Sequence, residues 1–440
     1  MTEALAARLR DAGAAMLVGT IWNPAGLILA KTVPVARAEA FVTGLGASPT
    51  WNAFASDRGT AFTAAMGTIG DHRLRLDPDA VRIFADGLAW GPATMVTQAG
   101  EPLGECTRSA LRRAEDRLAS AGITALVGHE LEFTLFDADG SPLPPDTWAP
   151  YSLAGVVRFE AFVREVYTRA AEVDLALEHV HAEFGPHQLE CSLAPRTPVA
   201  AADDLVLARL IIGRAARATG LIASFSPKPL TDSVGNGAHQ HVSLARDGAP
   251  LLSGGDGPHG LTRDGGAAIA GIVGALHEIQ AALAGSILSC ARLLPGTWAG
   301  AFAAWGLENR EVAVRLIAGD AAAANLEVKV IDPSTSGYLA SAAMLGAALR
   351  GVEDALPMPT EAAGDPGDLS AAAREAAGIV ALATVHMEAI TALEGSELAR
   401  RILGSPLVDA VVAVRRHEHQ HHGDASQEQL IDRFRFAWSV

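Results

Sequence analysis

The pattern of hydrophobic and polar residues changes near residue 100 of this chain. In the first hundred residues, short apolar runs at 15–21 and 26–33 are separated by proline and glycine. This texture predicts β-strands, with one helix over residues 35–45. The segment GEPLG, residues 100–104, is a turn-forming cluster. We therefore expect an α+β protein with two domains, residues 1–102 and residues 103–440.

After residue 103, long segments with helical periodicity alternate with short strand-like segments. Thr107 can cap the first helix, and Gly122 stands where that helix should end. Further helices are predicted over residues 156–173, 201–219, 266–289, 338–350, 370–393, 404–418 and 426–436. Strands are predicted near residues 123–136, 178–184, 187–194, 237–245, 310–317 and 326–331. The tract at 357–368, rich in Pro, Gly and acids, is predicted to be a surface loop.

The strand predicted at residues 123–136 is apolar but contains two acids, Glu130 and Glu132. Because side chains alternate along a strand, both carboxylates point to the same face. Neighbouring carboxylates in an apolar strand repel each other and lose hydration, so they require a compensating cation. The alternative is the exposed face of an edge strand, and this segment alone leaves both interpretations open.

Polar residues recur at alternate positions in the segments HAE (181–183), QLE (188–190), HQH (239–241) and EVK (327–329). Five glutamates and one histidine can therefore converge on one face of a sheet: Glu130, Glu132, Glu183, Glu190, His239 and Glu327. Carboxylates with a single imidazole suit Mg²⁺ or Mn²⁺ better than zinc. Six ligands are enough for two metal sites of three ligands each.

Three arginines accompany these acids within a short span: Arg292, Arg310 and Arg315. A guanidinium matches the oxygens of carboxylates and phosphates, and metal ions neutralise a phosphoryl group in transfer. Each arginine by itself is equally well explained by a surface salt bridge. Carboxylates for metals and arginines for anions together indicate phosphoryl transfer.

Composition narrows the class of protein. The chain has 440 residues, 49% hydrophobic and 19% charged, which is typical of a folded protein with more than one domain. Its formal charge of −16 argues against nucleic-acid or anionic-membrane partners. The N-terminus lacks the apolar segment of a secretory signal, and the three cysteines show no metal-binding spacing. We expect a cytoplasmic protein.

Six motifs in order resemble the glutamine synthetase family over nearly the whole chain. They are GHELEF (128–133), HAEFGPHQLE (181–190), NGAHQH (236–241), RLLPG (292–296), NR (309–310) and EVKVID (327–332). Two earlier segments, NPAG (23–26) and GDHRLRLDPD (70–79), resemble the small β-grasp domain of that family. The resemblance implies a catalytic domain with a curved antiparallel sheet backed by helices. It also implies ATP, two or more Mg²⁺ or Mn²⁺ ions per subunit, and a homo-oligomer, a dodecamer of two stacked hexameric rings.

The resemblance also implies a role for each matching residue. One metal would be held by Glu132, Glu183 and Glu190, and the other by Glu130, His239 and Glu327. Arg292 would bind the α-carboxylate of glutamate, and Gly235 would lie near that amino acid. Arg310 and Arg315 would contact ATP phosphates, with Lys329 near the transferred group. The nucleotide side would include His241, Ser243 and Phe225. The reaction would join glutamate to an amine through an acyl phosphate, with Arg292, Arg310 and Lys329 acting in catalysis.

The flap segment departs from the family pattern. Ammonia-using members carry a glutamate in a PGYEAP segment, whereas this chain reads PGTWAG at 295–300, with Trp298 in place of the glutamate. Tryptophan cannot accept a proton and adds a large apolar face. We therefore expect an organic amine, such as a polyamine, ethanolamine or another monoamine, in place of ammonium. Simple flap packing by Trp298 is the alternative.

Two competing functions and one other motif stay open. The chain can be an ammonia-dependent glutamine synthetase, or an inactive member with a structural or regulatory role. All six expected metal ligands are present, which argues against the inactive form. The histidine-rich run at 417–422 is predicted to be a polar helix face, with metal binding as its alternative.

Overall fold

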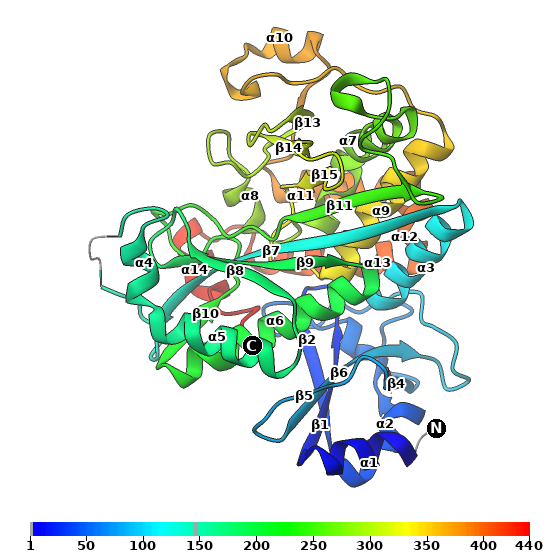
Figure 1. Cartoon of the computed structure of the whole chain (residues 1–440), viewed down its shortest axis with the longest axis vertical. Coiled ribbons are helices and arrows are strands. Elements are labelled where there is room, and N and C mark those ends of the chain that lie inside the picture. Colours follow the sequence, from blue (N-terminus) through cyan, green and yellow to red (C-terminus); the bar gives the residue numbers. More distant parts are fainter. Residues whose placement is uncertain (1–2, 145–147) are drawn as a thin grey trace.

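The computed structural model describes residues 3–144 and 148–440, and two sheets organise them (Figure 1). The N-terminal sheet has the strand order β2-β1-β6-β4-β3, with β5 beside β6. Its strands are β1 (Met16–Trp22), β2 (Ile28–Pro34), β3 (Leu45–Ala47), β4 (His72–Leu76), β5 (Arg82–Ile83) and β6 (Leu88–Val96). β1 is antiparallel to β2 and parallel to β6.

The helix α2 (Ala38–Thr43) packs on this sheet through Phe41. A Cβ atom on Gly19 of β1 would come within 2.2 Å of the Phe41 ring, so glycine permits this close approach. The arrangement is consistent with a β-grasp. The predicted helix over 35–45 is shorter than expected, because residues 35–37 form a separate 3₁₀ turn. A short helix at the N-terminus, α1 (Glu3–Asp11), was not predicted.

The second sheet has ten strands in the order β16-β13-β14-β15-β11-β7-β9-β8, with β10 beside β7 and β12 beside β11. Its strands are β7 (Ile123–Asp137), β8 (Leu177–Ala182), β9 (Gln188–Arg196), β10 (Leu221–Ser224), β11 (Gln240–Arg246), β12 (Ala249–Pro250), β13 (Phe302–Leu307), β14 (Val312–Ile317), β15 (Asn325–Val328) and β16 (Val380–Ala381). All paired neighbours are antiparallel except β13 and β14. The α+β prediction and the antiparallel sheet are confirmed.

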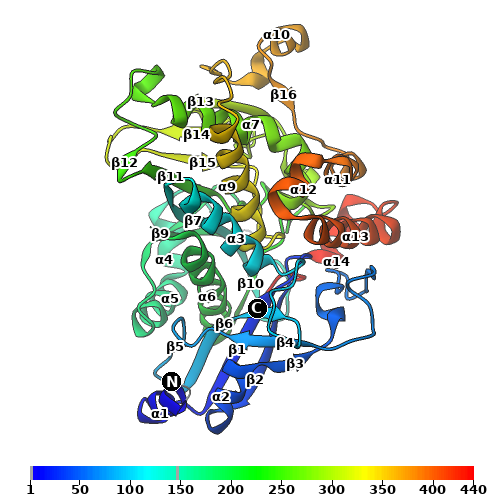
Figure 2. The same cartoon turned by 90° about the vertical axis from the view of Figure 1, so that its right-hand side faces the viewer.

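Helices α3, α6 and α9 pack together and against the long central strand β7 or its neighbours (Figures 1 and 2). The larger part of the chain contains α3 (Thr107–Ser120), α4 (Leu153–Arg158), α5 (Glu160–Glu172), α6 (Pro198–Ala218), α7 (Arg263–Leu283), α8 (Ser289–Arg292), α9 (Gly337–Glu353), α10 (Ala371–Ala376), α11 (His386–Gly395), α12 (Glu397–Leu403), α13 (Ser405–His422) and α14 (Gln427–Phe434). Among the described residues, α7 alone is long and apolar enough to cross a membrane, but 78% of its apolar window is buried. It packs against α9, as a core helix does.

Several elements differ from the sequence prediction. The predicted helix at 370–393 is divided into α10, the short strand β16 and α11, because Gly378 turns the chain with φ of 68°. The predicted helix at 266–289 ends at Leu283, and α8 starts separately at Ser289. Strand β13 was not predicted, since its segment FAAWGL lacks alternation and is buried on both faces over most of its length.

One face of the ten-stranded sheet therefore faces the helices, and the other is available for a site. Gln240 at the start of β11 shows which face is which, because it accepts a hydrogen bond from Ser341 of α9. His239 and His241, its neighbours in the chain, consequently point to the opposite face.

Candidate active site

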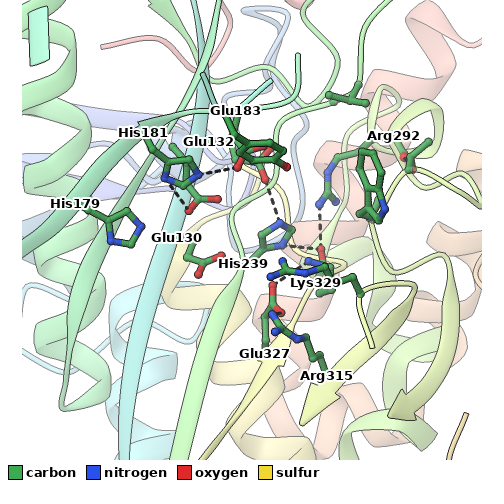
Figure 3. Close-up of a pocket in the computed structure, with 18 residues that line it drawn as sticks. Glu130, Glu132, His179, His181, Glu183, His239, Arg292, Arg315, Glu327 and Lys329 are labelled. Atoms are coloured by element: carbon green, nitrogen blue, oxygen red, sulfur yellow. Dashed lines mark hydrogen bonds and ion pairs between the residues drawn. The ribbon is translucent and has the colours of Figure 1, made fainter. Parts of the chain in front are cut away.

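A cavity of about 530 Å³ opens on the sheet face that carries these histidines (Figure 3). All six residues expected to bind metal line it: Glu130, Glu132, Glu183, Glu190, His239 and Glu327. Six further residues singled out in the sequence line it too: Gly235, Arg292, Trp298, Arg310, Arg315 and Lys329. The acidic and cationic groups thus face one another across a single space.

Strand register explains this convergence. Glu132 of β7 lies opposite Glu190 of β9 in the antiparallel pairing. Glu327 of β15 lies opposite Arg315 of β14 on one side and His241 of β11 on the other. Since β11 is next to β7, five adjacent strands and the residues flanking them carry their polar side chains to one face.

Glu132 is held by a set of hydrogen bonds around its carboxylate. Its Oε2 accepts from Gln188 Nε2 at 2.7 Å and from the Gly237 amide at 2.8 Å, and its Oε1 lies 3.1 Å from His239 Nε2. Burial by itself raises the pKa of Glu132, but His239, Arg292 and the Gly237 N–H together bring it below its ordinary value. Glu132 is therefore an ionised carboxylate in a fixed position.

The pKa of Glu190 is shifted in the opposite direction to that of Glu132. Burial raises its pKa well above the ordinary value, and the negative charges of Glu130, Glu132 and Glu183 raise it further. A buried carboxylate among other carboxylates needs either a proton or a nearby cation to be stable. The oxygen-rich donor set around it fits a hard divalent ion such as Mg²⁺ or Mn²⁺.

Glu327 lies between two cations. Lys329 Nζ donates to its Oε1 at 2.9 Å, and Arg315 Nη1 donates to its Oε2 at 3.3 Å. Burial opposes ionisation, but Lys329 and the neighbouring imidazoles hold the pKa of Glu327 far below its ordinary range. Its carboxylate stays ionised at any physiological pH.

His239 lies just before β11 and His241 lies within it, and each imidazole is close to a different glutamate. His239 pairs with Glu132, whereas His241 Nε2 lies 3.1 Å from Glu130 Oε1. Burial lowers the pKa of His241, but the neighbouring Glu130 carboxylate raises it above the ordinary value. Ligand atoms of Glu130, His241 and Glu327 lie within 4.8 Å of one another. The structure thus brings His241 close to these two acids, while the expected ligand His239 lines the same cavity and pairs with Glu132.

Arg292 ends α8 and is anchored by the main chain. Its Nη1 donates to the Val330 carbonyl at 3.1 Å and its Nη2 to the Lys329 carbonyl at 3.0 Å. Burial lowers the pKa of Arg292, while the negative charges of Asp332 and Glu132 oppose this effect. Two of the five guanidinium N–H groups are used in this way, so donors remain for an anionic ligand in the cavity.

Aromatic side chains form another wall of the cavity. Trp298 is 40% exposed, and its ring meets Phe184 edge to face with 4.8 Å between centroids. Tyr151 stacks on His181 with 6.2 Å between centroids. Burial and the charge of Glu183 raise the pKa of Tyr151 to about 12, so its hydroxyl is a neutral donor. The cavity therefore offers an apolar surface next to its carboxylates.

Comparison with known proteins identifies the family. The model of the glutamine synthetase catalytic domain matches residues 104–434. The chain belongs to the glutamine synthetase family. A gamma-glutamylpolyamine synthetase of Streptomyces coelicolor is 37% identical, over 94% of this chain and 91% of that protein. A glutamine synthetase of Methanosarcina mazei is 30% identical, over 76% of this chain and 77% of that protein.

Solved structures agree with this family assignment. A crystal structure of a glutamine synthase homolog superposes with a TM-score of 0.85 and 28% identity, covering 97% of this chain and 99% of that one. Members of the glutamine synthetase family are ligases that use ATP and divalent metals. The prediction of a carbon–nitrogen ligase is therefore confirmed at the level of the family.

Three of the residues assigned to the nucleotide side do not line the cavity. Phe225 is 0% exposed and packs beneath Arg209, whose guanidinium lies 4.4 Å from the ring centroid. Ser243 lies two residues beyond His241 on β11, and neither is part of the cavity wall. Phe225 is buried because it lies in the core between α6 and β7, and its sequence context of two serines does not reveal this position.

Sequence reasoning also missed four residues of the site: Tyr151, His179, His181 and Gln188. His179 and His181 alternate along β8 in the same way as the predicted acids, so strand alternation was a usable signal. Gln188 lies in the motif HAEFGPHQLE, which implies no role for it. Tyr151 had no such signal, because its segment shows neither helical nor strand periodicity.

Proposed function

We propose that this protein joins the γ-carboxylate of glutamate to an organic amine, using ATP and passing through γ-glutamyl phosphate. A carboxylate is a poor acyl donor because its oxygen leaves badly, and phosphorylation supplies a better leaving group. The amine then attacks the carbonyl carbon, the C–O bond to phosphate breaks, and phosphate departs as a proton is lost from nitrogen.

Metal ions in the cavity would draw negative charge from the phosphoryl oxygens. Glu132, Glu183 and Glu190 are proposed to hold one Mg²⁺ or Mn²⁺. Glu130 and Glu327 would hold a second, with His239 as the expected third ligand and His241 as its rival. The raised pKa of Glu190 supports this proposal, because a divalent ion relieves the repulsion among these carboxylates.

The cationic residues would then bind the substrates. Arg292 is proposed to bind the α-carboxylate of glutamate with the donors that its backbone anchors leave free, near Gly235. Arg310, Arg315 and Lys329 would contact the phosphates of ATP from their side of the cavity. Lys329 is a point charge, so it would stabilise the transferred group without a bidentate contact.

The observation that carries the choice of amine is Trp298 in the cavity wall. An indole cannot take a proton from ammonium, but its face attracts an alkylammonium and covers its carbon chain. Phe184 supports this face by edge-to-face contact. The likeness to a protein named gamma-glutamylpolyamine synthetase agrees with an organic amine, and a polyamine is the first candidate.

The deciding experiment measures ATP-dependent phosphate release with glutamate, Mg²⁺ and a panel of amines. The panel contains ammonia, ethanolamine, alkylamines, anilines and polyamines at equal concentration. We expect at least tenfold faster release with one organic amine than with ammonia. Activity with ammonia alone would instead identify a glutamine synthetase, and no turnover with any amine would favour the inactive form.

A pair of variants tests whether Trp298 contributes to amine binding. Trp298→Ala should lower kcat/KM for the preferred amine at least tenfold and leave the KM for glutamate unchanged, because only the amine contacts the indole. Leu307→Ala is the control, since Leu307 is similarly exposed, at 36%, but outside the cavity wall. Equal amine kinetics in both variants would show that Trp298 serves only to pack the flap.

The assembly is proposed to be a homo-oligomer, a dodecamer of two stacked hexameric rings in the cytoplasm. The family resemblance supports this proposal. Sedimentation of the purified protein tests it, and a monomeric species would contradict it.

A further inference from the structure

A second type of ligand set occupies one end of the cavity. His179 and His181 of β8 and Glu190 of β9 each place one potential ligand atom within 4.8 Å of the others. Figure 3 shows both imidazoles on the same side of the strand, with His181 nearer to the acidic cluster. Neither imidazole belongs to the sets expected for Mg²⁺.

Strand geometry produces this grouping. His179 and His181 are separated by one residue, so their side chains share a face, and their ring centroids are 5.3 Å apart. His181 lies opposite Glu190 in the pairing of β8 with β9, and its Nδ1 is 3.9 Å from Glu190 Oε1. The pairing of the two strands therefore brings the three groups together.

Hydrogen bonds engage one nitrogen of each ring and leave the other available. Glu183 is a carboxylate that only accepts, so His181 Nε2, at 2.9 Å from it, carries the proton. His179 Nε2 lies 3.1 Å from Ser192 Oγ, which also lies 3.5 Å from Glu190 Oε1. Both Nε2 atoms are thus engaged by oxygens, which leaves the Nδ1 atoms of the two rings for a metal ion. Imidazoles that bind metals commonly donate their other N–H to an oxygen in this way.

We propose that His179, His181 and Glu190 bind a divalent transition metal of the Zn²⁺, Co²⁺ or Mn²⁺ class, in addition to the ions held by oxygen ligands. Two imidazoles and one carboxylate suit borderline metals and leave positions open for water or substrate. Glu190 has two oxygens, so it can bridge to a neighbouring ion. His179 is exposed, which gives the ion a path from solvent.

The test uses Co²⁺ as the probe, added to the purified protein in a large excess of Mg²⁺ without substrates. Mg²⁺ occupies the oxygen sites, whereas imidazole ligands favour Co²⁺. We expect visible absorption bands typical of nitrogen-ligated Co²⁺ and saturation at one equivalent per chain. This readout depends on neither catalysis nor the identity of the amine.

Two variants at the site should remove the signal. His179→Gln and His181→Gln should each weaken Co²⁺ binding at least tenfold. Both rings lie at the cavity surface, so the thermal unfolding midpoint should not change, which checks that the variants fold. Co²⁺ binding that survives unchanged in His179→Gln, or no binding at all in excess Mg²⁺, would overturn the proposal.

The histidine-rich end of α13 provides the matched control. His421 is exposed there, and His421→Gln should leave the Co²⁺ bands unchanged. Bands that disappear in His421→Gln but persist in His179→Gln would assign the ion to α13 and refute the site on β8.

Discussion

At the scale of single residues, Gln188 illustrates how an uncharged side chain orders a charged site. Its amide Nε2 lies within 3.1 Å of Glu132 Oε2, the Gly235 carbonyl and Asn236 Oδ1. Its Oε1 accepts from the Gly185 amide at 2.8 Å. One buried amide thus connects the hairpin turn, a proposed metal ligand and the loop proposed to lie near glutamate.

Replacing this amide should affect both stability and metal binding. Gln188→Leu leaves several buried polar partners unsatisfied, so the free energy of unfolding should fall by about 2 kcal/mol. It also releases Glu132, so the affinity for Mn²⁺ should fall at least fivefold. Urea denaturation and calorimetric Mn²⁺ titration measure the two effects.

The control is Gln240→Leu, because Gln240 is as deeply buried but bonds Ser341 on the helical side of the sheet. It should lose stability and keep its Mn²⁺ affinity. If both variants lost metal affinity equally, Gln188 would have no particular role in positioning Glu132.

At the scale of elements, the flap between α8 and β13 depends on left-handed backbone. Gly296, Trp298 and Gly300 have φ of 74°, 56° and 76°. A Cβ atom on Gly300 would lie 2.9 Å from Ala313 Cα and 3.0 Å from Lys329 Cβ, whereas one on Gly296 would meet nothing within 4 Å. The two glycines share a conformation but differ in their surroundings.

Because the surroundings of Gly296 and Gly300 differ, alanine variants at these two positions form a matched pair. Gly300→Ala should lower kcat/KM at least tenfold, because the new methyl group displaces the flap or Lys329. Gly296→Ala carries the same backbone cost of about 1 kcal/mol without the collision, so its kinetics should change less than threefold. Steady-state phosphate release measures both. Equal losses would mean that backbone strain, not crowding at Lys329, sets the flap position.

Elements also show how far the sequence could predict this protein. Strand alternation places Glu130 and Glu132 on one face without any structure, and the same rule applies to Glu190 and Glu327. Strand alternation cannot choose between His239 and His241, which share a face and differ in the glutamate that each one contacts. It also cannot detect β13, whose buried residues show no alternation, or Tyr151, which reaches the cavity from an irregular segment.

At the scale of the whole molecule, the C-terminal helices hold the N-terminal part against the large sheet (Figure 2). Trp438 Nε1 donates to the Ala25 carbonyl at 3.1 Å, and Glu418 of α13 accepts from Ser56 at 2.9 Å. Beside them, Asp57 accepts from His422 at 2.8 Å and from His417 at 3.1 Å. The histidine-rich run is thus partly a set of contacts with the N-terminal part of the chain, not only the polar helix face that the sequence predicted.

Asp57 should make this contact depend on pH. Its side chain is 7% exposed, and burial raises its pKa, but the hydrogen bonds from His422 and the Gly59 amide and the charge of His417 bring it below the ordinary 3.8. A carboxylate with a lowered pKa stabilises the fold above its unfolded pKa, and the effect is lost as pH falls through the folded value. Asp57→Asn should therefore lower the free energy of unfolding by about 1–2 kcal/mol at pH 7.

Urea denaturation from pH 7 down to pH 3 provides the measurement. The gap between wild type and Asp57→Asn should stay constant to about pH 5 and narrow below 3.8, since protonated Asp57 resembles the amide. Asp424→Asn, at an exposed acid just beyond α13, should match wild type throughout. A gap independent of pH would mean that the shape of the Asp57 side chain, rather than its charge, joins the two parts of the chain.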